Sequence, residues 1–280
     1  MISTVTTIRD LRTTLLGWRE AGETVALVPT MGALHQGHKV LVETAGKMAK
    51  RAVTSIFLNP LQFGPKEDLA KYPRSLEADQ KLLSEAGCDL LYAPTPADMY
   101  PPDFAAKIDP GPLGTILEGA ARPGHFTGVV TVVIKLLLQT MPDIALFGEK
   151  DYQQLLIIHR AVRDLDLPIH IVGVPIVRDT DGLAFSSRNV YLSPDERKCA
   201  VALPNTLQET AATIREGKDI AAALKTGQDK LTKAGFTVDY LELADAHTLA
   251  PTRTLTGPAR LLAAAKIGAT RLIDNLAVAG

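Results

Sequence analysis

Residues 28–39 read V-P-T-M-G-A-L-H-Q-G-H-K, a turn between an apolar run and a stretch with helical spacing. Gly32 and Gly37 have the spacing of the glycines in a phosphate-binding P-loop, G-x-x-x-x-G-K-[ST]. His38 stands where that motif has its lysine, so the turn is not a P-loop. Its glycines still allow a ligand to approach backbone amides at the positive end of a helix that starts near His38.

His35 and His38 lie three residues apart at the expected helix start, so their rings can point the same way. Imidazoles in this position can donate hydrogen bonds to phosphoryl oxygens and stabilise charge that develops in a transition state. Two other interpretations stay open: two surface histidines in a glycine turn, or a pair of metal ligands. The flanking glycines favour phosphate chemistry, and no acidic or cysteine residue adjoins the pair to complete a metal site.

Over the first 175 residues, short apolar runs alternate with helical stretches, which is typical of βαβ units. We therefore predict an α/β fold with a Rossmann-like, doubly wound parallel sheet. The expected strands are 24–28, 52–58, 89–93, 144–147 and 169–174, and the expected helices are 40–50, 76–86 and 152–165. Ligands of such sheets bind where the strands end, which is where residues 28–39 lie.

The pattern changes after residue 176, where two helical stretches precede three short β-like segments. We predict residues 1–176 as a Rossmann-like ligand-binding domain and residues 177–280 as a smaller C-terminal α+β domain. The expected helices are 195–215 and 219–234, and the expected strands are 236–243, 259–266 and 270–276. The last of these, T-R-L-I-D-N-L, is interpreted as a structural strand. The Pro-rich residues 92–102 predict an ordered surface loop.

Composition narrows the classes of partner. The 280 residues are 46% hydrophobic with a formal net charge of −1, so no nucleic acid or membrane surface is expected as a partner. Cys88 and Cys199 have neither metal-ligand nor disulfide spacing, which fits a reducing compartment. The first twenty residues are charged throughout, unlike a secretory signal, and the apolar stretch 129–138 is too short to span a bilayer. A cytoplasmic location is expected.

Two further segments carry polar side chains where a predicted strand ends. Asn59 and Gln62 offer uncharged amides suited to the hydroxyls of a small acid, although the segment alone is typical of a turn. Lys150 can neutralise triphosphate charge, and Asp151 can accept hydrogen bonds from ribose hydroxyls. The G-E-K-D sequence around them also suits an ordinary helix N-terminus. Gln154 falls on the next helical turn.

In the second domain, residues 183–192 read L-A-F-S-S-R-N-V-Y-L. Ser186, Ser187 and Arg188 supply hydroxyls and a guanidinium group for phosphate oxygens. Earlier in the chain, residues 121–133 predict a turn into an apolar core helix, with a structural His125.

In their order along the chain, these segments resemble the motifs of the pantothenate synthetase (pantoate–β-alanine ligase) family, which belongs to the H-x-G-H nucleotidyltransferases. The resemblance runs from residue 28 to residue 276, and several motifs in one order make it specific. It implies an AMP-forming acid–amino-acid ligase of pantothenate and coenzyme A biosynthesis. ATP adenylates the carboxylate of pantoate with release of pyrophosphate, and the amine of β-alanine then displaces AMP.

The resemblance also implies the site residues. The expected catalytic residues are His38, His35, Lys150 and Arg188. The expected ATP-binding residues are Met31, Gly32, Ala33, Leu34, His35, Gln36, Gly37, His38, Gly148, Glu149, Lys150, Asp151, Val177, Phe185, Ser186, Ser187 and Arg188. Pantoate is expected at Gln62, Gln154 and Asn59, and β-alanine at Gln62. The resemblance also places Arg122 facing the site and Tyr72 of K-Y-P-R near substrate. Phe185 departs from the family pattern, which has methionine there.

Further implications concern the domains, the assembly and the ion. The family resemblance implies a first domain that binds nucleotide and pantoate, a second domain that closes over ATP, and a homodimer. It also implies Mg²⁺ carried on the ATP phosphates, with no protein ligand to the metal. One alternative is another H-x-G-H nucleotidyltransferase that adenylates a different small acid or a phosphate. It would need extra cations for a phosphorylated acceptor, whereas Gln62 and Gln154 suit a hydroxy acid. A nucleotide-binding regulatory module would need no hydroxy-acid pocket.

Overall fold

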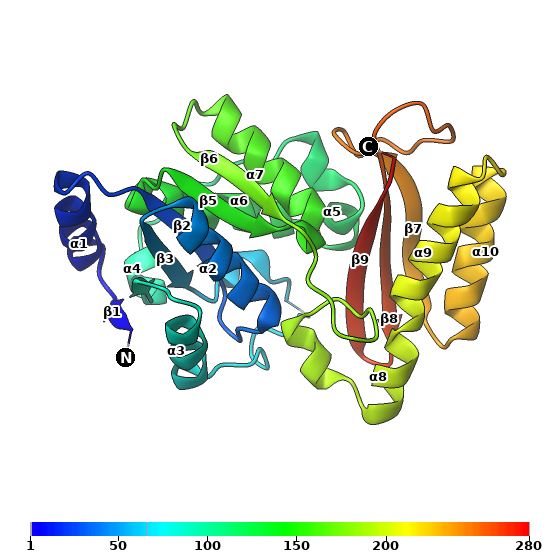
Figure 1. The fold of residues 1–280 in the computed structure, drawn as a ribbon, viewed down its shortest axis with the longest axis horizontal. Coiled ribbons are helices and arrows are strands. Elements are labelled where there is room, and N and C mark those ends of the chain that lie inside the picture. The colour runs from blue at the N-terminus through cyan, green and yellow to red at the C-terminus, as the bar shows by residue number, and fades with distance from the viewer. Residues whose placement is uncertain (1, 66, 280) are drawn as a thin grey trace. The chain divides into compact units, whose positions relative to one another are not determined.

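The computed structural model describes residues 2–65 and 67–279, which form two compact units (Figure 1). The first unit comprises Met1–Glu149 and Gln154–Pro175, and the second comprises Lys150–Gln153 and Ile176–Gly280. The division between Pro175 and Ile176 lies next to the boundary expected between residues 176 and 177. The sequence did not indicate that Lys150–Gln153 would group with the second unit.

The first unit is built on a six-stranded sheet with the order β1-β4-β3-β2-β5-β6, and every pairing between these strands is parallel. The strands are β1 (Ser3–Val5), β2 (Val25–Thr30), β3 (Arg51–Ile56), β4 (Leu90–Tyr92), β5 (Ile144–Gly148) and β6 (His170–Val174). Five of them match the expected runs. The edge strand β1 was not expected.

Helices cover both faces of this sheet because the side chains of each strand alternate between its faces. Ala26 and Val28 of β2 are buried with α2 and α3 in one apolar core. Leu27 points to the opposite face and is also buried, and α6 packs against β2 there. The helices of this region are α1 (Ile8–Glu20), α2 (Gln36–Met48), α3 (Leu76–Glu85), α4 (Pro96–Met99), α5 (Glu118–Ala121), α6 (His125–Thr140) and α7 (Tyr152–Asp164). The doubly wound α/β prediction is confirmed.

The strand order reverses at β2, which pairs with β3 on one side and with β5 on the other. Open parallel sheets bind ligands at such a switch point, beyond the carboxyl ends of the strands. Residues 31–35 connect the end of β2 to the start of α2. The turn at residues 28–39, called the histidine turn from here on, therefore lies at the switch point of the sheet.

The Pro-rich stretch 92–102 contains the one-turn helix α4, where a loop was expected. Thr95 and Asp98 form a capping box: Asp98 N donates to Thr95 Oγ1 at 3.2 Å, and Thr95 N donates to Asp98 Oδ2 at 3.0 Å. Pro96 occupies the first helical position, where its missing N–H removes no hydrogen bond.

The second unit contains an antiparallel sheet in the order β7-β8-β9, so the α+β prediction is confirmed. Helices α9 and α10 lie side by side on one face of this sheet (Figure 1). Gly227 of α10 permits the close packing, because a Cβ there would lie 2.6 Å from Leu241 and 2.7 Å from Thr210. The elements are β7 (Thr237–Asp245), β8 (Ala259–Ile267), β9 (Thr270–Ala279), α8 (Pro194–Ala200), α9 (Ala202–Arg215), α10 (Ile220–Lys233) and the 3₁₀ turn η4 (Ser187–Tyr191).

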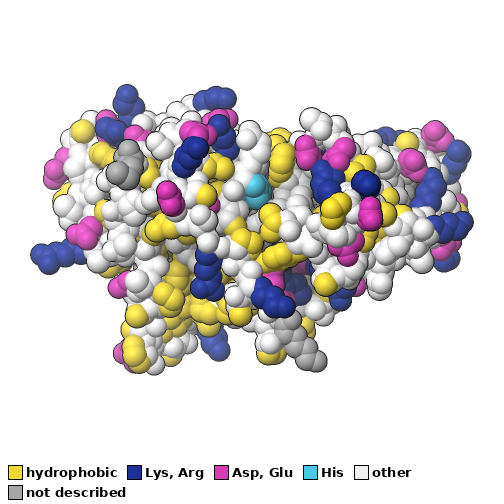
Figure 2. Space-filling model, turned by 90° about the horizontal axis from the view of Figure 1, so that it is seen from below, with side chains coloured by type: hydrophobic (Ala, Val, Ile, Leu, Met, Phe, Trp, Pro, Cys, Tyr) yellow, Lys and Arg dark blue, Asp and Glu magenta, His cyan; other side chains and the backbone are white. Residues whose placement is uncertain are grey.

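The surface carries both signs of charge. On the face shown in Figure 2, basic and acidic side chains are interspersed, with hydrophobic side chains between them. Within residues 2–65 and 67–279, no helix is both long and apolar enough to cross a membrane.

Candidate active site

The histidine turn caps helix α2, which begins at Gln36 rather than near His38. His35 is the N-cap residue, and its Nδ1 accepts a hydrogen bond from Gly37 N at 3.1 Å. His38 reciprocates, because its Nδ1 accepts a hydrogen bond from His35 N at 3.3 Å. The pair thus has the pattern of a capping box with imidazoles in place of the usual hydroxyl and carboxylate. The two ring centroids lie 4.1 Å apart.

This cap also determines which ring nitrogen carries the proton. A neutral imidazole has one donor and one acceptor nitrogen, and the backbone amides occupy both Nδ1 acceptors. His35 and His38 are therefore both assigned as Nε2–H tautomers. Each ring presents a donor at its outer nitrogen, which is the group that a phosphoryl oxygen needs.

A buried carboxylate holds the turn that leads to these histidines. Gly32 and Ala33 have φ values of 84° and 52°, a left-handed conformation that costs a non-glycine residue about 1–2 kcal/mol. Asp79 of α3 accepts hydrogen bonds from Ala33 N at 3.1 Å and from Leu34 N at 2.7 Å. A Cβ on Gly32 would lie 3.1 Å from Asp79 Oδ2. Asp79 therefore fixes residues 32–34 against α3.

Asp79 is only 4% exposed. Burial raises the pKa of its carboxyl above the ordinary value, and the hydrogen bonds from Leu34 and Ala33 oppose that rise. Burial has the larger effect on the pKa, which means that the charged carboxylate is less favourable here than in water. Asp79 is therefore a poor choice of residue if its role is only to stabilise the fold. This balance is typical of a group retained for the geometry that it imposes.

Asp79→Asn is expected to weaken ATP binding about tenfold, which corresponds to about 1.4 kcal/mol. An amide can accept from only one of the two backbone N–H groups, and its NH₂ opposes the other. The loss of stability should stay within about 1–3 kcal/mol, the cost of an unsatisfied buried amide. Titration calorimetry with ATP and thermal unfolding measure the two effects.

The control for this variant is Asp98→Asn, which removes a capping carboxylate from α4 of the same unit. Asp98→Asn should leave ATP binding unchanged. Wild-type affinity for ATP in folded Asp79→Asn would contradict the role assigned to Asp79.

The loop after β3 brings an amide to the histidine turn. Gln62 is 8% exposed, and its Nε2 donates to the Sδ atom of Met31 at 2.9 Å. Its Oε1 accepts a hydrogen bond from Asn59 Nδ2 at 3.0 Å. Asn59 is 1% exposed and also bonds Gly128 O and the hydroxyl of Tyr100. Asn59 thus orients Gln62, and direct contact of Asn59 with pantoate stays a prediction.

A second set of side chains holds the backbone of Gln62. His125 Nδ1 lies 2.8 Å from Gln62 O, and its Nε2 lies 3.0 Å from Arg122 Nη1. Because a guanidinium group can only donate, His125 accepts at Nε2 and donates to Gln62 O from Nδ1. Burial and the nearby Arg122 lower the pKa of His125 to about 4, so the ring is neutral near pH 7. Arg122 in turn forms a bidentate pair with Glu67 at 2.7 and 2.6 Å.

The close fit of this loop against α6 depends on a glycine. A Cβ on Gly128 would lie 2.2 Å from Leu61 O and 2.6 Å from Gln62 N, so no larger residue fits without a shift of the backbone. The tract 121–133 thus supports the position of Gln62 as well as the core.

Tyr72, which was expected near substrate, is 5% exposed and packs edge-on against Phe63, with ring centroids 6.0 Å apart.

The residues after β5 divide between the two units. Gly148 and Glu149 belong to the first unit with Gln154, whereas Lys150 and Asp151 belong to the second. Lys150 Nζ lies 3.9 Å from Asp151 Oδ2, and the Lys150 side chain is 20% exposed. The contribution of Gln154 to a pantoate site stays a prediction.

The remaining predicted residues lie in a hairpin and turn of the second unit. Phe185 N donates to Val177 O at 3.1 Å, which closes the hairpin. Ser186 caps η4, because its Oγ accepts a hydrogen bond from Arg188 N at 3.3 Å. Ser187 and Arg188 occupy the first positions of η4 and are partly exposed. Their contacts with phosphate stay predictions.

Sequence reasoning missed the residues that hold the predicted ones. Asp79, Tyr100 and Glu67 carry no motif of their own and act through contacts across 46, 41 and 55 residues. One signal was available for Asp79. It lies one helical turn before Leu83, on the face of α3 that is buried, where an apolar residue would be expected. Within the described ranges, no three His, Cys, Asp or Glu side chains gather as metal ligands.

Comparisons with known proteins agree with this architecture. The sequence signature of the pantoate–β-alanine ligase family matches residues 3–277. A pantothenate synthetase of Rhizorhabdus wittichii is 57% identical over 275 residues, which cover 98% of each chain. One from Paramagnetospirillum magneticum is 53% identical over 275 residues, covering 98% of this chain and 97% of the relative.

Two crystal structures are also similar. Pantothenate synthetase from Thermus thermophilus superposes with a TM-score of 0.94 at 49% identity, covering all of both chains. Pantoate–β-alanine ligase from Francisella tularensis, complexed with β-γ ATP and β-alanine, has a TM-score of 0.85 at 32% identity and covers 99% of this chain and 98% of its own. The chain of 280 residues therefore belongs to the pantoate–β-alanine ligase family.

Proposed function

We propose that this chain condenses pantoate with β-alanine to pantothenate at the expense of ATP, with AMP and pyrophosphate as the other products. The observation that carries the proposal is the pair of imidazoles at the switch point of the sheet, whose Nδ1 atoms accept hydrogen bonds from backbone amides, in a turn where Met31 contacts the amide of Gln62. The family membership and the ATP and β-alanine ligands of the Francisella relative support the same reaction.

In the first half-reaction, a carboxylate oxygen of pantoate attacks the α-phosphorus of ATP, and the bond to the β-phosphate oxygen breaks. Negative charge grows on the phosphoryl oxygens, and His35 and His38 donate hydrogen bonds to them from Nε2. Lys150 and Arg188 neutralise the triphosphate and the departing pyrophosphate. Catalysis thus depends on positioning and electrostatics rather than on a covalent enzyme intermediate.

In the second half-reaction, the amine of β-alanine attacks the acyl carbon of pantoyl adenylate, and the bond to the AMP oxygen breaks. Gln62 contacts pantoate and marks the position where β-alanine arrives. Its amide is uncharged, so it binds hydroxyl and carboxylate oxygens and lowers the nucleophilicity of the acid less than a cation would. The buried Asn59 bonds that amide, and the partly buried Arg122 and His125 contact the backbone carbonyl of Gln62.

Mg²⁺ enters with the nucleotide, as part of the MgATP substrate. The carboxylate at the histidine turn, Asp79, accepts hydrogen bonds from two backbone N–H groups. The other side chains there are imidazoles and amides, whereas Mg²⁺ prefers carboxylate, phosphate and water oxygens. This donor set fits an ion held on the phosphates, where it supplies charge neutralisation to the attacked phosphate. No protein ligand to the metal is proposed.

We further propose that the enzyme is a cytoplasmic homodimer. The family resemblance supports the dimer, and two cysteines without metal-ligand or disulfide spacing support a reducing compartment. Sedimentation equilibrium at micromolar concentration would give twice the mass of the 30.0 kDa chain. A single species of monomer mass would contradict the dimer.

A product assay tests the proposed reaction. The wild-type chain with pantoate, β-alanine and MgATP should release AMP and pyrophosphate, and ADP as product would overturn the adenylate mechanism. Pantoate alone should support exchange of labelled pyrophosphate into ATP, without β-alanine. If a phosphorylated acceptor or another acid supports exchange while pantoate does not, the chain is a different nucleotidyltransferase of the same superfamily.

A further inference from the structure

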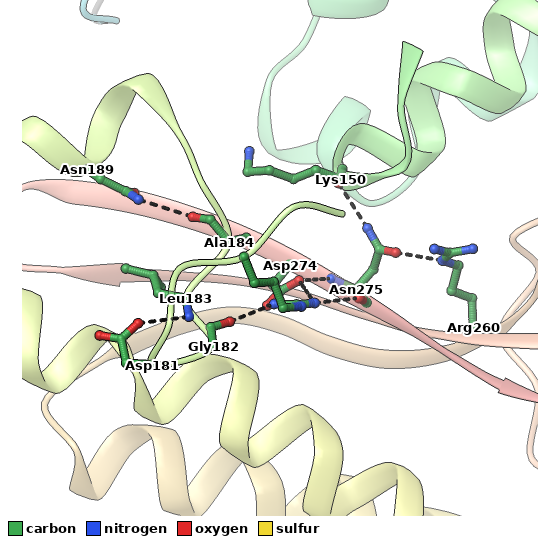
Figure 3. Close-up of polar contacts among 10 residues, drawn as sticks. Lys150, Asp181, Gly182, Leu183, Ala184, Asn189, Arg260, Asp274 and Asn275 are labelled. Carbon is green, nitrogen blue, oxygen red and sulfur yellow. Dashed lines mark hydrogen bonds and ion pairs between the residues drawn. The ribbon is translucent and has the colours of Figure 1, made fainter. Parts of the chain in front are cut away.

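The terminal strand β9 contains a polar pair, Asp274 and Asn275, in the interior of the second unit. Their exposed fractions are 2% and 3%. The sequence T-R-L-I-D-N-L is interpreted as a structural strand, and β9 is such a strand. Figure 3 shows that contacts from this pair lead to both segments that carry predicted phosphate-binding residues.

Asn275 holds the backbone of Lys150. Its Nδ2 donates to Lys150 O at 2.9 Å, across 125 residues of sequence. Its Oδ1 accepts a hydrogen bond from Arg260 Nε at 2.6 Å. Because the guanidinium group only donates and the carbonyl only accepts, the orientation of the amide is fixed. In Figure 3 the Lys150 side chain extends away from Asn275, so the amide anchors the main chain and leaves the ammonium group to other partners.

A second anchor lies two residues further on. The hydroxyl of Tyr152 donates to Ala246 O at 3.0 Å, and the guanidinium carbon of Arg260 lies 3.8 Å from the centre of the Tyr152 ring. Arg260 therefore links Asn275 to Tyr152 by a hydrogen bond on one side and a cation–π contact on the other. These contacts explain why Lys150–Gln153 groups with the second unit.

Asp274 holds the segment that leads to Arg188. It forms a bidentate pair with Arg178 at 2.7 and 2.8 Å, and Arg178 also donates to Gly182 O at 3.1 Å. Arg178 pairs with Ala184 across the hairpin, and Asn189 Nδ2 donates to Ala184 O at 3.1 Å. The contacts thus run from β9 through the hairpin to the turn η4.

Stability alone is a weak reason for this arrangement. Buried ion pairs and polar networks are often replaced by apolar residues without loss of stability, because desolvation offsets the attraction. What a buried network of hydrogen bonds provides is a defined geometry of the groups that it joins. Here the network holds the backbone of Lys150 at one end. At the other end it holds the hairpin that leads into the Ser186–Arg188 turn.

We propose that Asp274 and Asn275 are positioning residues. They hold Lys150 and the Ser186–Arg188 turn in the positions needed to bind the phosphates of one nucleoside triphosphate. This inference rests on the proposed function, in which Lys150 and Arg188 neutralise phosphate charge. Asn275 acts through the carbonyl of Lys150, and Asp274 acts through Arg178 and the hairpin. Neither side chain needs to touch the substrate.

Two variants of Asn275 test the link to Lys150. Asn275→Ala removes the amide, and Asn275→Asp keeps the acceptor for Arg260 while it opposes Lys150 O with a second oxygen. Both should lower the turnover of pantoate-dependent pyrophosphate exchange about 10- to 100-fold, the scale of a misplaced catalytic group. Their KM for pantoate should not change, and both should weaken ATP binding in calorimetry. Asp239→Asn is the control, because it breaks the ion pair of Asp239 with Arg271 of β9, which lies outside this network.

A double-mutant cycle with Lys150→Ala separates positioning from general structural damage. If Asn275 acts through Lys150, Asn275→Ala should change turnover and ATP affinity by less than about twofold in the Lys150→Ala background. Equal losses in both backgrounds would overturn the inference, as would wild-type behaviour of folded Asn275→Ala and Asn275→Asp. Absence of pantoate-dependent exchange in the wild-type protein would overturn the proposed function and not this inference. In that case the double-mutant cycle measured by ATP affinity still tests the inference.

Discussion

His38→Asn is expected to lower the turnover of pantoate-dependent pyrophosphate exchange at least ~100-fold, the scale of losing one donor to a transition-state oxyanion. The asparagine oxygen can occupy the position of Nδ1, which accepts the hydrogen bond from His35 N. Asparagine has no atom that corresponds to Nε2. The variant therefore preserves the start of α2 and removes the outer donor, and steady-state exchange kinetics measure the loss.

His38→Ala provides the comparison, because it removes both functions of the ring. It should lose as much turnover as His38→Asn and, in addition, about 1 kcal/mol of stability with the helix cap. Thermal unfolding of the two variants separates the cap from the catalytic donor. If His38→Asn retains wild-type turnover, His38 serves only to cap the helix.

Lys150→Ala should produce a loss of similar size, at least ~100-fold in turnover. The pantoate carboxylate and the triphosphate are both negative, so their approach requires a cation that offsets the repulsion. The loss should appear in the rate of exchange, because the charge that Lys150 meets grows as pyrophosphate departs. ATP binding should weaken as well, because the triphosphate is already charged in the ground state. Exchange kinetics at saturating ATP and pantoate measure this rate.

Lys39→Ala is the matched control, since it removes the same charge from the residue that follows His38. Lys39 Nζ lies 3.7 Å from Glu85 Oε2 on the surface of α2 and α3, in an ion pair of the kind that contributes little. Turnover of Lys39→Ala should remain near that of the wild type. A large loss in Lys39→Ala with little loss in Lys150→Ala would show that the lysine next to the histidine turn, and not Lys150, serves the phosphates.

The fold could be predicted because its signals are local. Apolar runs and helical periodicity each extend over enough residues to identify β2, β3, α3, α7 and the three strands of the second unit. β1 escaped prediction because three residues at a sheet edge show no period, and two of the three are only partly buried. The turn at 28–39 was likewise predictable because its glycines and histidines act on their own backbone.

The supporting residues could not be predicted, because their partners lie far away in the sequence. The hydrogen bonds of Asp79 to Ala33 and of Asn275 to Lys150 exist only after the chain has folded. The grouping of Lys150–Gln153 with the second unit has the same origin. In the sequence these residues continue directly from β5, and their contacts with Arg260, Asn275 and the backbone of Ala246 form only in the folded chain.

The second unit cannot be expressed by itself as a single continuous fragment, because it includes residues 150–153. A fragment that starts at Ile176 would contain the whole β7–β9 sheet but would lack the short peptide 150–153. Asn275 would then lose its acceptor and Arg260 the ring of Tyr152, which leaves an amide and a guanidinium group of the sheet without these contacts. An autonomous version of this half needs the tetrapeptide grafted back, for example by circular permutation, because the unit is continuous in space and interrupted in sequence.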